Sequence, residues 1–155
     1  MGIVRGIDHV AMTVPDVEEA TRFLREAFGA RVLYDGQTPS SPAVAGSHAE
    51  RVFGMPPGGS WDWRRMLAVG DSVLELFHYR VEGQSPAGET YDLGIQHIAL
   101  LVDDLDEAAA RFERAGGTLY AAHDAPDGRV GPGTAWVYGR SPWGAIFELV
   151  TFPAR

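Results

Sequence analysis

The sequence predicts an α+β fold built from two tandem βαβββ modules, because two separate motifs each occur twice in the chain. IDHVA at residues 7–11 is repeated as IQHIA at residues 95–99. VLELF at residues 73–77 is repeated as IFELV at residues 146–150. The same order of strand-like and helix-like segments lies between the two motifs in each half, which indicates an internal duplication.

The first half reads as one strand, one helix and three further strands. A strand at about residues 7–14 leads into a helix at residues 16–28, where apolar residues recur at helical spacing. Asp16 with Glu19 is typical of a helix start, and Gly29 is typical of a helix end. The remaining strands are expected at residues 31–34, 65–69 and 73–79.

The second half repeats these signals. Asp104 and Glu107 mark the start of a predicted helix at residues 104–115, which Gly116 and Gly117 end. Turn residues favour hairpins in both halves, at residues 70–71 and 142–144. The later strands are expected at residues 118–121, 134–138 and 145–152.

The two modules are expected to form a single domain of residues 1–155. Module 1 covers residues 5–80 and module 2 covers residues 93–153. Module 1 is the longer of the two, and its extra residues fall in the stretch 36–60, which is rich in Pro, Gly, Ser and Ala. So long a segment predicts either a surface loop or a lid that controls access to a site.

Composition limits the classes of partner. The net charge of -8 argues against nucleic acid, because phosphate binding needs a basic face. The chain also lacks the run of roughly 20 apolar residues that a membrane span needs. It has no cysteine, which excludes disulfides, thiolate ligands and a cysteine nucleophile. We therefore expect a cytoplasmic protein that acts on a small molecule.

Both repeated motifs carry a residue that can bind a metal. His9 and His97 occupy equivalent positions in the first strands, and Glu75 and Glu148 occupy equivalent positions in the last strands. Each Glu is the only charged residue of an otherwise apolar strand, and an ionised carboxylate there is costly unless it is paired or bound to a metal. Two such Glu residues, each matched by a His, predict one divalent metal site.

Imidazole and carboxylate ligands suit Zn, Ni, Co, Fe(II) or Mn. Four protein ligands around an octahedral ion leave two positions for water or substrate oxygens. The ligand set therefore favours a catalytic site over a closed structural one.

These motifs resemble the vicinal oxygen chelate superfamily, which includes glyoxalase I, methylmalonyl-CoA epimerase, extradiol dioxygenases and antibiotic-resistance proteins. IDHVAMTVPDVEEATRFL, GDSVLELF, GIQHIALLVDDLDEAAARF and SPWGAIFELV carry the resemblance. The resemblance implies a curved mixed-sheet half-barrel, often in a homodimer, with His9, Glu75, His97 and Glu148 as metal ligands. It favours the lyase and isomerase branch; the alternatives are an Fe(II) extradiol-type dioxygenase and a ligand-binding resistance protein without catalysis.

Glutathione-using glyoxalases commonly carry two Arg and one Asn as anchors for the thiol cofactor. Thr13, Tyr79 and Leu93 stand at the matching positions, which argues against glutathione dependence. The two repeated openings are more similar to methylmalonyl-CoA epimerase and its relatives.

The branch implies abstraction of a proton α to a carbonyl, with a metal-stabilised enolate, on a small carbonyl or acyl-thioester substrate. Glu148 is our expected base and Glu75 its pseudo-symmetric partner. Aromatic residues that share a strand face with these groups, and one arginine in a glycine-rich segment, are the expected pocket residues: Phe77, Tyr79, Trp136, Tyr138 and Arg129.

Overall fold

The computed structural model describes residues 2–121, 123–124 and 134–152. The chain forms two compact units. The first contains the residues up to 25 and residues 29–85, and the second contains residues 26–28 and the residues from 86 onward. Each unit is described by itself below.

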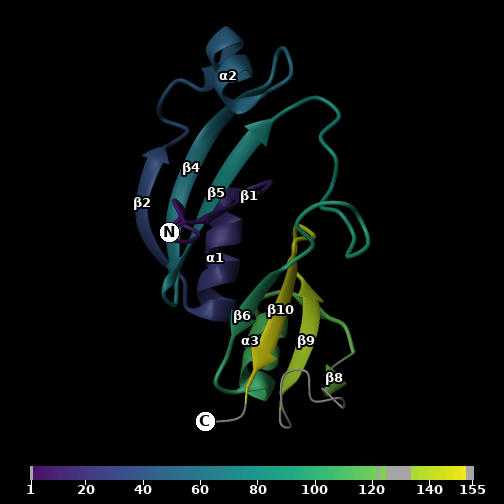
Figure 1. The fold of residues 1–155 in the computed structure, drawn as a ribbon. Helices are drawn as coiled ribbons and strands as arrows, with labels where there is room; N and C mark the ends of the chain where they lie inside the picture. Colours follow the sequence, from purple (N-terminus) through teal and green to yellow (C-terminus); the bar gives the residue numbers. More distant parts are fainter. Residues whose placement is uncertain (1, 122, 125–133, 153–155) are drawn as a thin grey trace. The chain divides into compact units, whose positions relative to one another are not determined.

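The first unit is built on a five-stranded sheet (Figure 1). The strand order is β1-β5-β4-β2. The short β3 also pairs with β4, at Ser60 and Trp61, near the start of that strand. β1 runs parallel to β5, whereas the other pairs are antiparallel. Its elements are β1 (Val10–Thr13), α1 (Val17–Phe28), β2 (Arg31–Gln37), β3 (Val44–Ala45), α2 (Gly46–Phe53), β4 (Ser60–Val69) and β5 (Ser72–Arg80).

Helix α1 begins and ends where its capping residues predict. The Asp16 carboxylate accepts a hydrogen bond from the Glu19 backbone N–H, which satisfies one of the free donors at the helix start. Gly29 ends the helix in the left-handed region, with φ of 70°. A residue with a Cβ is strained in this conformation, so glycine is the natural helix terminator.

One face of the first sheet packs against α1. Arg65 on β4 donates to the Thr21 hydroxyl of the helix and pairs with Glu18 one turn earlier. Leu67 and Leu76 point to the same face and are fully buried. Side chains alternate along a strand, so Arg64 and Met66 point to the opposite face, which carries Glu75.

The insertion at residues 36–60 is more ordered than a loop. It contains β3, which pairs with β4, and helix α2. A small buried core lies under the insertion and consists of Ala49, Met55 and Trp61. Partly buried hydrophobic residues, including Phe77 and Tyr79, pack against this core. The insertion therefore covers part of the sheet face that carries Glu75.

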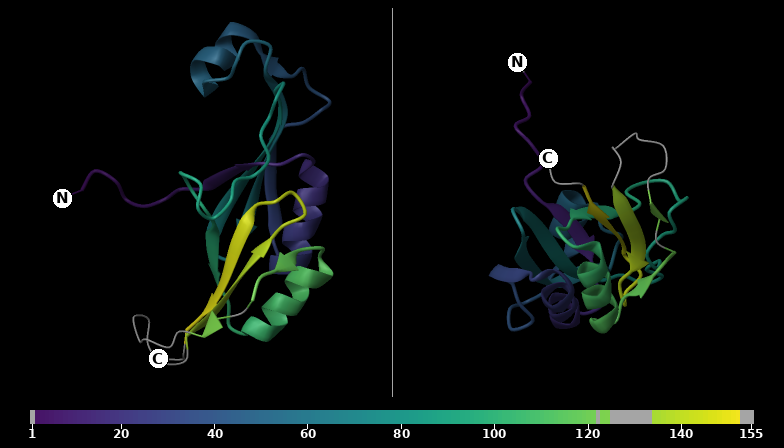
Figure 2. Two further views of the ribbon diagram at one scale, coloured as in Figure 1. Left: turned by 90° about the vertical axis from the view of Figure 1, so that its right-hand side faces the viewer. Right: turned by 90° about the horizontal axis from the view of Figure 1, so that it is seen from below.

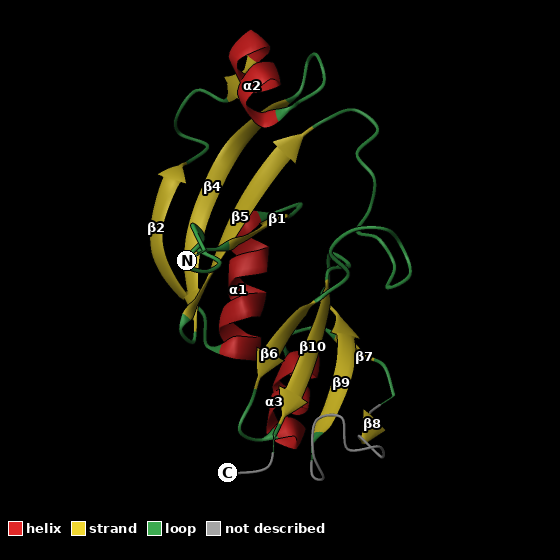
Figure 3. Ribbon diagram, viewed as in Figure 1, coloured by secondary structure: helices red, strands yellow, loops and turns green. Residues whose placement is uncertain are grey.

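The second unit repeats the architecture (Figure 3). Its strand order is β6-β10-β9-β7, with β8 pairing with β9, and β6 runs parallel to β10. This order matches that of the first sheet strand for strand. Its elements are β6 (Ile98–Leu101), α3 (Leu105–Arg114), β7 (Thr118–Leu119), β8 (His123–Asp124), β9 (Ala135–Arg140) and β10 (Ile146–Thr151).

Helix α3 covers one face of the second sheet (Figure 2). Asp104 caps its start by accepting from the Glu107 N–H, as α1 is capped by Asp16. Phe112 is fully buried and contacts Phe147 of β10, with ring centroids 6.3 Å apart. Phe147 and Glu148 alternate on β10, so the face of Glu148 is turned away from α3.

The α+β class and the repeated βαβββ order are confirmed. Several details differ from the prediction. The first strand starts at Val10 rather than at residue 7, and β4 starts at Ser60 rather than at residue 65. β7 is only two residues long, β8 was not predicted, and the insertion holds a helix and a strand. No helix in the described part of the chain has both the length and the apolar run that crossing a bilayer needs.

Candidate metal and catalytic site

Strand register brings each predicted His next to its Glu. β1 pairs with β5 so that Ala11 lies beside Glu75, and β6 pairs with β10 so that Ala99 lies beside Glu148. Each His lies two residues before its Ala, and residues two apart in an extended chain share a face. The parallel pairing therefore turns both His side chains toward the carboxylates.

The two pairs have the same geometry. His9 Nε2 lies 3.1 Å from Glu75 Oε2, and His97 Nε2 lies 3.1 Å from Glu148 Oε2. Two ligand atoms about 2.1 Å from one metal ion and at right angles to each other are about 3 Å apart. The spacing of each pair thus fits neighbouring positions around a divalent metal as well as a direct hydrogen bond.

Burial makes the carboxylates costly without a partner. Glu75 is only 7% exposed, and the side chain of Glu148 is 16% exposed. An ionised carboxylate at such a position requires charge compensation or hydrogen bonds. The imidazole beside each carboxylate compensates part of this cost, and a bound cation would compensate the rest.

The Nδ1 atoms of His9 and His97, which point away from the carboxylates, differ in their hydrogen bonding. His9 Nδ1 lies 2.8 Å from Asp8 Oδ2, and this hydrogen bond together with the charge of Glu75 raises the pKa of His9 against the opposing effect of burial. A carboxylate on Nδ1 orients an imidazole so that Nε2 faces a metal. His97 Nδ1 is buried and has no hydrogen-bond partner among the described residues.

The four predicted ligands are found as two pairs, one in each unit. Among residues 2–121 and 134–152, no three His, Asp or Glu side chains lie close enough together to hold one metal ion. His9 belongs with Glu75, and His97 belongs with Glu148. Each pair presents one imidazole and one carboxylate, which are donors suited to a borderline or hard divalent ion.

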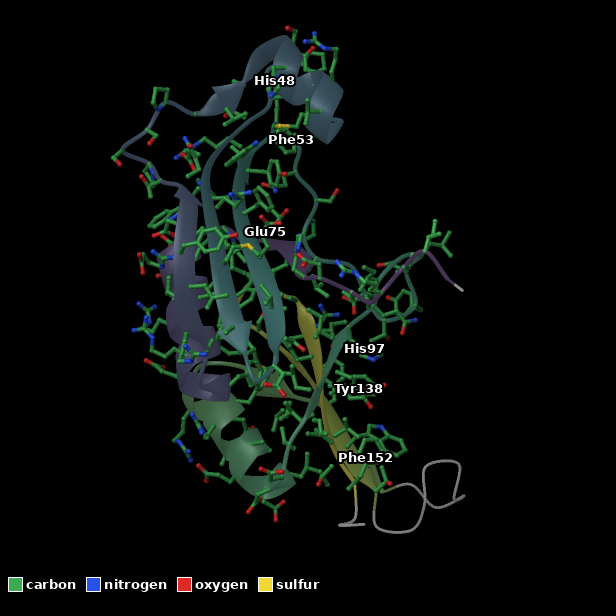
Figure 4. The ribbon with its side chains drawn as sticks, turned by 60° about the vertical axis from the view of Figure 1, so that its left-hand side comes forward. His48, Phe53, Glu75, His97, Tyr138 and Phe152 are labelled. Atoms are coloured by element: carbon green, nitrogen blue, oxygen red, sulfur yellow. The ribbon has the colours of Figure 1, made fainter. Side chains whose placement is uncertain are left out.

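The residues opposite the two carboxylates differ. Met66 of β4 faces Glu75 across the first sheet, and Tyr138 of β9 faces Glu148 across the second. Burial, the charge of Glu148 and a hydrogen bond to it raise the pKa of Tyr138, so its phenol stays protonated at neutral pH. The Tyr138 ring also contacts His97 edge to face, with centroids 5.1 Å apart (Figure 4).

The predicted pocket residues lie on the expected faces. Phe77 and Tyr79 share the face of Glu75, and Phe77 packs edge to face on Trp61 at 5.3 Å. Trp136 lies opposite Val150, on the face of Glu148. Arg129 lies outside the described residues.

Asp62 is a further buried carboxylate on β4. In the structure it accepts hydrogen bonds from His78 Nδ1 at 2.6 Å and from Arg80 Nε at 2.9 Å. Its carboxylate is therefore engaged in a local network that ties β4 to β5.

Two residues of the candidate site were not singled out by sequence reasoning. Asp8 directly precedes His9, and an acidic residue next to a ligand His can indicate a hydrogen bond to that His. Gln96 stands at the equivalent position before His97, so a comparison of the two repeats does not select Asp8. Arg64 has no counterpart in the repeated motifs, so the repeat provides no reason to select it. Its location on the face of Glu75 depends on the register of β4 with β5, which the sequence does not reveal.

Comparison with known proteins agrees with this architecture. The sequence model of the Glyoxalase/Bleomycin resistance protein/Dioxygenase superfamily matches residues 6–149. A 2-epi-5-epi-valiolone epimerase from Actinomyces sp is 31% identical over 96% of this chain and 80% of its own length. An ethylmalonyl-CoA/methylmalonyl-CoA epimerase from Cereibacter sphaeroides is 25% identical over 92% of this chain and 95% of its own length.

Solved structures show the same fold. A glyoxalase family protein from Bacillus cereus aligns with a TM-score of 0.74 and 20% identity, covering 97% of this chain and 95% of that one. A variant of the fosfomycin resistance protein FosX from Listeria monocytogenes, solved with Mn(II), aligns with a TM-score of 0.62 and 18% identity over 95% of this chain and 90% of that one.

Proposed function

Because the chain belongs to the Glyoxalase/Bleomycin resistance protein/Dioxygenase superfamily, we propose that it is a metal-dependent epimerase that acts at a carbon next to a carbonyl group. Relatives named as epimerases support an enzyme of the isomerase type. One observation carries the metal-dependent part of the proposal: the equivalent His–Glu pairs of the two sheets have equal spacing, 3.1 Å.

The proposed metal ligands are His9 and Glu75 from the first unit, and His97 and Glu148 from the second. Superfamily members typically bind divalent metals, and the FosX structure with Mn(II) is one example. Both imidazoles present Nε2 to the carboxylates, so the donor set of this chain suits such an ion. Asp8 holds the His9 ring in the orientation that this requires.

In the proposed reaction the C–H bond α to the carbonyl breaks and a proton is later added to the opposite face of the same carbon. A bound divalent metal supplies the Lewis acidity that makes this proton removable. Glu148 accepts the proton on a carboxylate oxygen, with the Tyr138 phenol donating to the same carboxylate. Glu75, the proposed pseudo-symmetric partner, donates the proton that is added to the opposite face, and exchange with solvent then removes the proton from Glu148 and returns one to Glu75. No electrons are gained or lost, so no redox cofactor is needed.

The proposed substrates are small carbonyl compounds and acyl thioesters. The two epimerase relatives cover both classes by name, because one is a 2-epi-5-epi-valiolone epimerase and the other an ethylmalonyl-CoA/methylmalonyl-CoA epimerase. Phe77 and Tyr79 on one sheet, and Trp136 and Tyr138 on the other, are the proposed pocket residues. The other proposed partner is a second copy of the chain in a homodimer.

Exchange of substrate α-protons with D₂O tests the proposal directly. Metal-loaded protein is incubated with a panel of ketones, 2-oxo acids and acyl thioesters, and deuterium incorporation is followed by NMR. Glu148→Gln should abolish exchange while the bound metal is retained. Glu82→Gln, at an exposed position outside the site, is the matched control and should leave exchange unchanged.

Two results would contradict the proposal. Purified wild-type protein that binds no divalent metal under metal-replete conditions would remove its chemical basis. Unchanged exchange in Glu148→Gln would remove the assigned base. Oxygen uptake with catechols, measured on the Fe(II)-loaded protein, would instead support a ring-cleaving dioxygenase.

A further inference from the structure

Arg64 lies beside the His9–Glu75 pair, and the reaction proposed above gives this positive charge no role. It lies on β4 opposite Phe77, on the sheet face that carries Glu75. Its Nη1 is 3.6 Å from Glu75 Oε1, which is too long for a hydrogen bond. Its Nε is buried and has no hydrogen-bond partner in the part of the chain that the structure describes.

The neighbouring Arg65 has a structural role and provides a comparison for Arg64. Arg65 points to the helix-covered face and donates to both oxygens of Asp35, at 2.8 Å and 3.1 Å. It also pairs with Glu18 at 3.0 Å and is only 7% exposed. Arg64 has none of these partners, and its side chain is 36% exposed. Support of the sheet is therefore supplied by Arg65, and the partly exposed guanidinium of Arg64 remains available to a ligand.

Gly36 makes room for the Arg64 guanidinium. The ladder between β2 and β4 is irregular between Asp35 and Gln37, and Gly36 lies in this irregularity. A Cβ on Gly36 would be 2.0 Å from Arg64 Nη2, 2.4 Å from Nε and 2.5 Å from Cζ. Any other residue would occupy the space of the guanidinium. The bulge and its glycine thus hold a positive charge at a defined place beside Glu75.

A guanidinium presents paired N–H donors that match the two oxygens of a carboxylate or a phosphate. An anionic substrate needs such a local cation here, because the chain as a whole carries a net charge of -8 and repels anions. A carbonyl group directed to the metal ligands and an anionic group directed to Arg64 would fix a substrate at two points.

We propose that Arg64 is a specificity-determining residue, which binds a carboxylate or phosphate group of the substrate, and that Gly36 positions its guanidinium. This proposal rests on the proposed function for the metal and for the carbonyl chemistry. It narrows the substrate class to carbonyl compounds that also carry an anionic group. Arg64, Gly36 and Glu75 all belong to the first unit, so the proposed anion-binding position is formed by that unit alone.

Anion binding tests the proposal without requiring turnover. Malonate and methylphosphonate, as carboxylate and phosphate probes, are titrated calorimetrically into metal-loaded and metal-free protein. Arg64→Met should weaken binding of the preferred probe to the loaded protein at least tenfold, as expected for loss of a charge-assisted hydrogen bond. The stronger of the two probes identifies the anionic group.

Gly36→Ala is the sharper variant, because it keeps the charge and changes only its position. The atoms in its way are the far end of a flexible side chain, so the guanidinium moves and the fold is retained. We expect at least a fivefold loss of anion affinity with an unchanged melting temperature. Arg64→Lys should recover part of the affinity. Arg22→Met removes a charge from the exposed surface of α1, where the side chain is 62% exposed, and should change nothing.

The same variants separate substrate recognition from reaction chemistry. α-Proton exchange is compared for dihydroxyacetone phosphate and dihydroxyacetone, and for levulinate and 5-hydroxypentan-2-one. Arg64→Met should lower kcat/KM at least tenfold for the anionic member of the preferred pair, mainly through KM, and at most about twofold for the neutral one.

Failure of this proposal is distinguishable from failure of the proposed function. If neither probe binds to wild-type protein, or if Arg64→Met and wild type bind both equally, Arg64 is only a counter-charge for Glu75 and the inference is wrong. Metal binding and proton exchange could then still be intact. If the protein binds no metal, the titrations of metal-free protein still report whether Arg64 recognises anions.

Discussion

Asp8 acts on His9 from the side away from Glu75, through the hydrogen bond to Nδ1. Loss of such a support typically weakens metal binding by about tenfold or more. Asp8→Ala should therefore lower metal affinity about tenfold, measured by chelator competition at pH 8, where protons compete little for imidazole. Gln96→Ala is the matched control, since His97 Nδ1 has no partner among the described residues. Equal losses in both variants would contradict a specific role for Asp8.

Tyr138 is the residue whose removal should separate metal binding from catalysis. Tyr138→Phe keeps the ring against His97 and deletes the donor to Glu148. Loss of one such hydrogen bond costs about 1 kcal/mol, so proton exchange should fall roughly fivefold. Metal content measured by elemental analysis should be unchanged. A variant that loses its metal, or one that keeps the full exchange rate, would rule out this positioning role.

At the residue scale, the sequence predicts which residues belong to the candidate site better than it predicts which residues contact them. His9 and Glu75 could be selected because the repeat places the same residue types in the second half. Gly36 and Arg64 have no counterpart in the repeat, and their contact arises from an irregularity in strand pairing. Such irregularities depend on packing and not on a residue pattern, so the contact becomes visible only in three dimensions.

At the scale of elements, β4 is linked to its neighbours by two carboxylates whose pKa values are lowered. Hydrogen bonds from Arg65 lower the pKa of Asp35, and those from His78 and Arg80 lower the pKa of Asp62 in spite of its burial. A lowered folded-state pKa means stability that is complete above the unfolded value of about 3.8 and is lost as the pH falls through the folded pKa.

This linkage predicts that the sheet of the first unit is weakened by acid. The urea midpoint should fall as the pH decreases from 5 to 3. Asp35→Asn should reduce the free energy of unfolding by ~1–3 kcal/mol at pH 6, as a charged hydrogen bond is lost, and by much less at pH 3. A variant with the same loss at both pH values would show that the carboxylate charge is not responsible.

The contact between α3 and its sheet gives a second prediction at the scale of elements. A Cβ on Gly139 would be 2.6 Å from the ring of Phe112, which is fully buried, and 2.9 Å from Leu119. Overpacking of this kind costs about 1–3 kcal/mol, so Gly139→Ala should lower the melting temperature by several degrees. Gly6→Ala, where a Cβ meets no atom within 4 Å, should have no effect.

Element boundaries were predictable wherever a local rule applies. Asp16 and Asp104 cap their helices through hydrogen bonds to the residue three positions later, which a sequence pattern can encode. Helix α2 has no side-chain cap at Ala45 and depends on burial of Ala49 against Trp61. A helix that depends on tertiary contacts has a weak local signal, which explains why the sequence predicted no helix in the insertion, only a surface loop or a lid.

At the scale of the whole molecule, the four-ligand proposal predicts a definite metal stoichiometry. One divalent ion per chain should be bound, and His9→Ala and His97→Ala should each remove nearly all of it, although the two residues belong to different units. Elemental analysis of dialysed protein measures both values. If each variant retained half of the metal, the two pairs would be separate sites. Met12→Leu, a size-conserving change on the same strand as Ala11, is a control for folding.

The different residues facing Glu75 and Glu148 have a consequence for how this fold can change over time. A duplication first yields two identical halves, and each half here keeps one imidazole and one carboxylate. Beyond that shared requirement the paired positions have diverged: the first half has Met66 opposite Glu75 and Arg64 two residues earlier, and the second half has Tyr138 opposite Glu148 and Trp136 two residues earlier. A hybrid that joins the first half of this chain to the second half of a related epimerase should therefore inherit substrate preference from one parent and proton-transfer rate from the other.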